Sequence, residues 1–171
     1  MSDDGLRAPT GTPRLLPQVA LPDYRYVPGR GPHPNKHVGG HNIMESIEWG
    51  QPAWDPARPW TLDRRYLYGH DLLAHRFYWE SHEVWEEMWH AIPLDRPERR
   101  LIQGLIQTAA TTLKNHMGHT KARGRLADRA AIHLRAAASL GGRETIWGVD
   151  IPVLVAQLEQ RVQWPMVTLS R

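Results

Sequence analysis

The 171-residue sequence contains no cysteine, a single phenylalanine and no long apolar run. The lack of cysteine excludes disulfide bonds and thiolate chemistry, and it favours a cytoplasmic protein. No apolar stretch approaches the roughly 20 residues that a membrane-spanning helix needs, so we expect no membrane partner. Neither a glycine-rich phosphate loop nor a Gly-x-Ser-x-Gly motif occurs, which leaves nucleotide hydrolysis and serine-hydrolase chemistry without support.

The formal net charge of +3 is small for this length. Acidic residues interleave with the basic ones and no nucleic-acid-binding motif is present, so we do not expect a nucleic-acid partner. The abundant residue types are tryptophan, with 8 copies, and histidine, with 10. Tryptophan supplies large apolar area for a core, and histidine supplies metal ligation or titration near neutral pH.

The composition divides the chain into three regions. Residues 1–20 are rich in proline, glycine and threonine without periodicity, which predicts a disordered tail. Residues 21–60 contain prolines that prevent long helices and aromatic residues that anchor the chain, which predicts an extended arm wrapped on the domain or on a partner. Residues 61–165 show helical periodicity. The sequence therefore predicts an all-α protein, a single bundle of about five helices with an extended, irregular N-terminal arm.

Capping residues and helix breakers predict where the helices end. Thr61 is the expected N-cap of the first helix, which Gly69 weakens. Pro97 suits the first turn of the third helix, and Gly141-Gly142 ends the fourth. No strand is predicted.

The chain is organised around residues 77–90, which lack glycine and proline. As a helix, this segment has a broad apolar stripe that includes Trp85. His82 and Glu86 are four residues apart and lie on one face, and Glu83 leans toward the same point. A half-buried imidazole with two carboxylates is costly unless a metal ion, hydrogen-bond donors or a substrate pairs with it.

The spacing His-x-x-x-Glu-x-x-Trp, formed by His82, Glu86 and Trp89, resembles the motif of the domain of unknown function 309 family, a group of small helical proteins. Further matching positions are Phe77, Glu80 and residues 101–107. The resemblance extends over roughly residues 62–140. It implies a helical fold and metal binding through this motif, and it implies no particular reaction.

The metal hypothesis assigns a role to each residue of the cluster. His82 and Glu86 are the predicted ligands, and Glu83 is the predicted catalytic base that acts on a bound water. The imidazole favours Zn or Fe over Mg or Ca. Expected supporting residues are Glu80, Gln103, Gln107 and Trp89. The alternative is that His82 and Glu86 hydrogen-bond one another and form a structural polar seam against the two glutamines.

Catalytic zinc needs three protein ligands, so at least one more has to come from elsewhere. Additional ligand candidates are His33, His37 and His41, provided that the arm folds over the central helix. Proline and glycine between them rule out a helical face, so the alternative is an exposed arm whose histidines coordinate nothing. Glu87 and His90 have the spacing of di-iron bundles, but the chain has no second copy of that motif.

Two functional hypotheses follow from these patterns. The first is a metal-dependent, hydrolase-like enzyme that acts on a small-molecule substrate, with the arm as a lid. The second is a non-catalytic helical binding or oligomerisation module whose arm docks on a second subunit. We expect a homo-oligomer, and the sequence leaves open whether the protein is an enzyme.

Overall fold

The computed structural model describes residues 11–37, 40 and 47–170. These residues form five α-helices, one short 3-10 helix and a two-stranded antiparallel ribbon, which confirms the all-α class. In chain order the elements are η2 (Trp60–Leu62), α2 (Arg64–Ala74), α3 (Tyr78–Ala91), α4 (Pro97–His116), α5 (Thr120–Gly141), β1 (Thr145–Ile146), β2 (Val149–Asp150) and α6 (Ile151–Glu159). Among the helices of the described residues, none combines the length and apolar character that a bilayer crossing requires.

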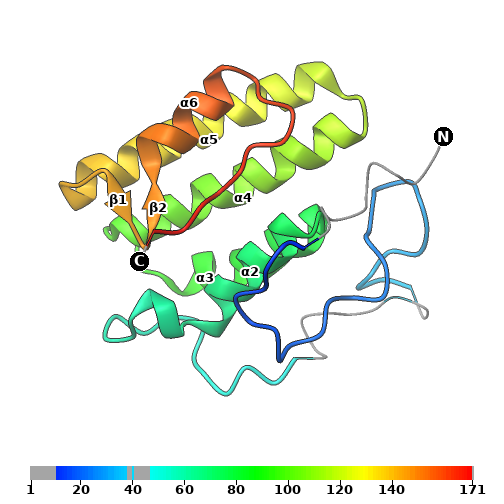
Figure 1. Ribbon diagram of the computed structural model, residues 1–171, viewed down its shortest axis with the longest axis horizontal. Helices are drawn as coiled ribbons and strands as arrows, with labels where there is room; N and C mark the ends of the chain where they lie inside the picture. The colour runs from blue at the N-terminus through cyan, green and yellow to red at the C-terminus, as the bar shows by residue number, and fades with distance from the viewer. Residues whose placement is uncertain (1–10, 38–39, 41–46, 171) are drawn as a thin grey trace.

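Helix α4 is the centre of the bundle. It packs against α5 on one side and against α3 on the other, while α2 packs on α3 and α6 on α5 (Figure 1). Gly104 allows α4 and α5 to approach closely, because a Cβ there would lie 2.7 Å from Leu134 Cγ. The buried apolar side chains of all five helices form one continuous core.

The predicted start of the first long helix is wrong by two residues. Asp63, not Thr61, is the N-cap of α2, since its carboxylate accepts a hydrogen bond from Tyr66 N at 3.0 Å. Thr61 lies in the preceding 3-10 turn η2. Pro97 begins α4 as predicted.

The strands β1 and β2 were not predicted. They pair Ile146 with Val149 across a two-residue turn, Trp147-Gly148, in which both residues have positive φ, 48° and 75°. This is the turn geometry that matches the twist of a hairpin. The C-terminal segment returns to the ribbon, where Leu169 pairs with Val149.

Helices α2 and α3 are held together at Gly69. A Cβ at this position would lie 2.2 Å from Nε1 of the fully buried Trp85, so only glycine leaves room for the indole. Ser81 Oγ also donates to Gly69 O at 2.9 Å. The glycine that weakens α2 in isolation therefore fixes the buried face of α3, and with it the direction in which the polar face points.

The predicted N-terminal tail is docked on α2 where the structure describes it. The carboxylate of Asp71, which is 1% exposed, accepts hydrogen bonds from Arg14 Nε at 2.9 Å, Leu15 N at 2.7 Å and Leu16 N at 2.9 Å. The composition of residues 1–20 does not predict this contact, because it depends on a buried carboxylate elsewhere in the chain that accepts three hydrogen bonds. The contact therefore differs from the disorder that the sequence predicts.

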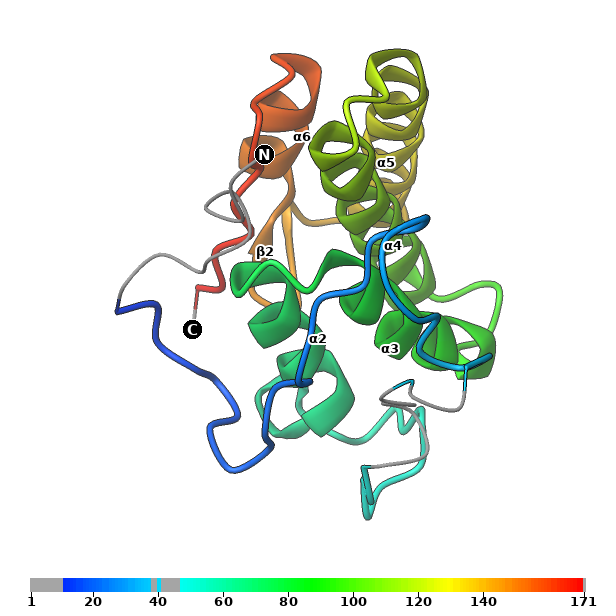
Figure 2. The same ribbon diagram turned by 90° about the vertical axis from the view of Figure 1, so that its right-hand side faces the viewer.

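The arm continues from α2 to α3 of its own chain (Figure 2). Arg25 Nε donates to the carbonyl oxygen of His75 at 3.1 Å, just past the end of α2. Tyr26 N then donates to Oε1 of the fully buried Glu80 at 2.8 Å. These contacts bring the arm to the face of α3 that carries the predicted site.

Candidate metal site

Helix α3 places one carboxylate beside each nitrogen of an imidazole. His82 Nδ1 lies 3.3 Å from Glu83 Oε1, and His82 Nε2 lies 3.3 Å from Glu86 Oε1. The three side chains are 27%, 22% and 43% exposed, so the cluster is half-buried and reachable from solvent. Nδ1 itself is shielded from solvent and makes no regular hydrogen bond to the described residues.

The orientation of this cluster follows from the packing of α3. Val84, Trp85 and Met88 are fully buried against the bundle. With about 100° of rotation per residue, the cluster lies on the opposite side of the helix from these residues. The core thus fixes the rotation of α3, and the polar residues are left at the edge of the bundle where the arm passes.

His82, Glu83 and Glu86 are the one group of three or more potential metal ligands in the described part of the chain. Their ligating atoms lie within 4.8 Å of one another. Within that same part of the chain, neither Glu83 nor Glu86 forms an ion pair with lysine or arginine. The adjacent Glu87 differs, because its carboxylate accepts from Arg65 at 2.9 and 3.1 Å. The cluster therefore offers two carboxylates that no lysine or arginine of the described residues neutralises.

The arm contributes a residue that sequence reasoning missed. Asn35 Nδ2 donates to Glu83 Oε2 at 3.3 Å. The His33 ring packs near Trp79 with centroids 5.5 Å apart, and its Nδ1 accepts from Asn35 N at 3.2 Å. His33 thus orders the loop that delivers the amide. In the sequence Asn35 lies between His33 and His37, and its only distinguishing feature is this position among the arm histidines.

The arm histidines are not members of the cluster where they are described. His33 and His37 lie outside the group of three, and His41 falls outside the described residues. The arm therefore reaches the cluster through an amide instead of an imidazole.

Two of the predicted supporting residues, Gln103 and Trp89, have other partners in the structure. Gln103 Oε1 accepts from Arg100 of its own helix at 3.3 Å. Gln107 Oε1 is buried and has no hydrogen-bond partner among the described residues. Trp89 packs beneath the guanidinium of Arg99, whose Cζ lies 4.3 Å from the ring centroid. No hydrogen bond links either glutamine to the carboxylates of the cluster within the described ranges. Glu80 supports the site indirectly, by holding the arm.

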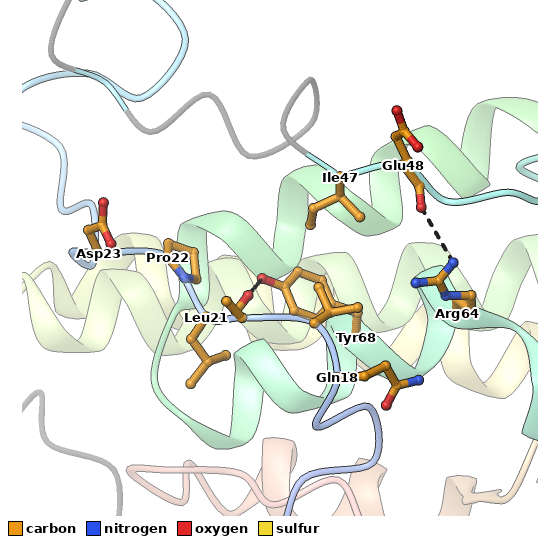
Figure 3. Close-up of a pocket in the computed structure, with 10 residues that line it drawn as sticks. Gln18, Leu21, Pro22, Asp23, Ile47, Glu48, Arg64 and Tyr68 are labelled. Atoms are coloured by element: carbon orange, nitrogen blue, oxygen red, sulfur yellow. Dashed lines mark hydrogen bonds between the residues drawn. The ribbon is translucent and has the colours of Figure 1, made fainter.

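A separate hollow of about 480 Å³ opens where the arm crosses α2 (Figure 3). Tyr68 forms its floor and donates its hydroxyl to Ala20 O at 2.7 Å. Burial raises the pKa of the Tyr68 phenol, so it remains a donor at neutral pH. None of the residues predicted as site residues lines this hollow.

The fold and the cluster together define a small helical-bundle protein with a polar, half-buried cluster on helix α3. Residues 66–126 match the family model described as domain of unknown function (DUF309). This match confirms the resemblance to that family over residues 66–126. The matched segment contains the whole cluster, whereas the arm and α6 lie outside it. No curated protein and no solved structure matches the chain.

Proposed function

We propose that this protein binds a divalent transition-metal ion, Zn or Fe, at His82 and Glu86. The observation that carries the proposal is the convergence of three ligating side chains within 4.8 Å, with no basic side chain of the described residues to neutralise the carboxylates. A mixed imidazole and carboxylate donor set suits these metals better than Mg or Ca.

Both carboxylates lie 3.3 Å from the ring, so their surroundings distinguish their roles: Nδ1 beside Glu83 is shielded from solvent, and Asn35 already holds Glu83. In a tetrahedral zinc site with bonds of about 2.0 Å, neighbouring ligand atoms are about 3.3 Å apart. His82 Nε2 and Glu86 Oε1 are separated by 3.3 Å, so this pair can share one ion without rearrangement. An imidazole gives one nitrogen to a metal and commonly directs the other toward a carboxylate. We therefore assign Glu83, beside Nδ1, to orient the ring.

The position of Glu83 bears on the hydrolase hypothesis. Its two oxygens face His82 Nδ1 and the Asn35 amide, so a role as general base would require it to leave both. Two protein ligands are also fewer than the three of a typical catalytic zinc site. The geometry thus favours metal binding with open coordination positions, and hydrolysis of a small-molecule substrate with Glu83 as base stays a prediction.

Elemental analysis of protein purified without a histidine tag, combined with zinc titration calorimetry, tests the proposal. We expect stoichiometric metal in the wild type and its loss in His82→Ala. His90→Ala is the matched control, because His90 is an exposed histidine on the same helix. Glu83→Gln should weaken affinity by roughly 10- to 100-fold, as expected for a residue that orients a ligand.

The competing function is a helical binding or oligomerisation module in which the cluster is only structural. That interpretation predicts no metal in the wild type and a loss of stability in His82→Ala that exceeds the loss in His90→Ala. Finding both results together would refute the metal proposal.

A further inference from the structure

A second site of different chemistry lies at the end of α2. A cleft of about 420 Å³ opens between α2, the start of α3 and the C-terminal segment 164–167. Its lining is largely apolar, and includes Leu73, Tyr78 and Trp164. This volume lies in the range of small-molecule sites, which are mostly apolar with a few polar groups that fix orientation.

His70 is a buried polar residue of this cleft, as is Thr112, whose hydroxyl donates to Thr108 O at 2.9 Å. His70 is 5% exposed, and its Nε2 has no hydrogen-bond partner among the described residues. The ring is held between Tyr66 and Trp85, with centroids 4.5 and 5.0 Å away. Burial lowers the pKa of His70 to about 3, so the imidazole is neutral at physiological pH and offers one donor and one acceptor. An unmet polar atom in such surroundings is costly unless a ligand satisfies it.

Arg76 is the one charged residue among the described residues that line the cleft. Its guanidinium lies 5.4 Å from the ring centroid of Trp164, which in turn stacks on Tyr78 at 6.0 Å and 13°. Arg76 follows the C-cap of α2 and has a φ of 68°, the left-handed conformation of a helix end in which Phe77 N donates to Leu72 O at 2.8 Å. This helix end holds Arg76 at the rim of the cleft.

We propose that this cleft binds a small aromatic carboxylic acid that carries a hydroxyl group at the far end of its ring. The ring packs on the aromatic and aliphatic walls, the carboxylate pairs with Arg76, and the hydroxyl reaches the imidazole of His70. Six residues separate His70 from Arg76, which corresponds to a backbone rise of about 9 Å along a helix, on the scale of a two-ring acid. The site does not depend on the metal cluster of α3.

Titration calorimetry with 6-hydroxy-2-naphthoate tests this inference, with two comparison probes. 2-Naphthoate lacks the hydroxyl, and 6-hydroxy-2-naphthamide lacks the charge. We expect saturable binding of the hydroxy acid. Each comparison probe should bind more weakly, by about tenfold for the amide and roughly three- to tenfold for the acid without the hydroxyl.

Variants assign the two ends of the ligand. Arg76→Gln should weaken the hydroxy acid about tenfold and leave the amide nearly unchanged. Arg143→Gln is the control for the loss of one exposed cation. His70→Phe should make 6-hydroxy-2-naphthoate and 2-naphthoate bind with equal affinity, because phenylalanine keeps an aromatic ring at position 70 but cannot hydrogen-bond the hydroxyl group. Ala74→Trp tests the cleft without disturbing the core, because Ala74 is an exposed residue of the lining and the larger side chain fills the cleft. We expect this variant to fold and to lose binding of the hydroxy acid.

Two results would overturn the inference. The first is the absence of saturable binding by the hydroxy acid to the wild type. The second is binding that Ala74→Trp and His70→Phe both leave unchanged, since the probe would then occupy another surface.

Discussion

Replacing Gly69 by alanine tests the contact that orients the candidate site. The added Cβ would lie 2.2, 2.4 and 2.8 Å from Nε1, Cε2 and Cδ1 of Trp85. Carbon atoms in contact normally stay about 3.5–4.0 Å apart, so the indole has to retreat by more than about 1 Å. The ring is fully buried, and close-packed protein interiors leave little room for such a shift.

Overpacking of this kind typically costs about 1–3 kcal/mol, and three simultaneous clashes place Gly69→Ala at the upper end. Alanine regains up to about 1 kcal/mol through its better helix propensity. We therefore expect a net loss of about 2 kcal/mol in the free energy of unfolding. That loss lowers the melting temperature by roughly 4–8 °C in a chain of this size.

Gly124→Ala provides the matched control for this change. Gly124 is also helical, in α5, but a Cβ there meets no atom within 4 Å. The same substitution should therefore stabilise the protein by about 0.5–1 kcal/mol. Urea denaturation followed by circular dichroism measures both variants. Equal shifts at the two glycines would refute the reasoning, as would a loss at Gly69 that persists unchanged in a Trp85→Phe background.

Three further predictions concern the arm, the buried imidazole and the end of α3. Asp71→Asn leaves Arg14 and two backbone amides with a neutral acceptor, so we expect a loss of about 2–3 kcal/mol in the free energy of unfolding. Trypsin should also cleave the N-terminal segment that contains Arg14 faster, and unchanged cleavage would contradict the contact. Because burial lowers the pKa of His70 from 6.5 to about 3, the unfolded chain takes up a proton there below about pH 6.5 while the folded protein does not. The free energy of unfolding is therefore independent of this group above about pH 6.5 and falls as the pH decreases, by about 2 kcal/mol at about pH 5. His70→Phe should remove this part of the pH dependence measured by urea denaturation. Parallel pH profiles of the variant and the wild type would refute this role of His70. Arg99→Lys loses a planar guanidinium that packs on Trp89 and donates to its carbonyl, which should cost about 1–2 kcal/mol in thermal unfolding; an unchanged melting temperature would count against that role.

The helices could be predicted because their signals are local. Pro97 in the first turn of α4, and the glycine pair after α5, act within one turn of the residues they limit. The choice of Asp63 over Thr61 as N-cap was not predictable from type, since both residues are good caps. The preceding 3-10 turn decides it. The hairpin was missed because two residues per strand are too few to show alternation.

The part of the candidate site that depends on helical spacing was predictable from the sequence. The contacts that other elements make with it were not. The pairing of His82 with Glu86 follows from a separation of four residues. Asn35 comes from an irregular arm 48 residues before its partner Glu83, and no periodic pattern connects the two. Gln103 was expected to face the carboxylates, but Arg100 lies three residues before it on the same helix and is the nearer partner.

Glu80 and Glu83 explain why the arm and the cluster are connected, although only one of them belongs to the cluster. Glu80 is fully buried and holds the arm through Tyr26 N, so its contact is independent of any ion. Glu83 contacts both the arm, through Asn35, and the imidazole of His82. The two contacts use different oxygens, Oε2 for Asn35 and Oε1 for His82, so a docked arm holds the carboxylate where it orients the ring. By linkage, arm docking and the proposed ion binding then strengthen one another by the same factor. One partly exposed hydrogen bond is worth about 0.5–1.5 kcal/mol, so this coupling is limited to roughly two- to tenfold in affinity. The arm would therefore adjust the proposed metal binding by a small factor, but it is too weakly coupled to switch the site on or off.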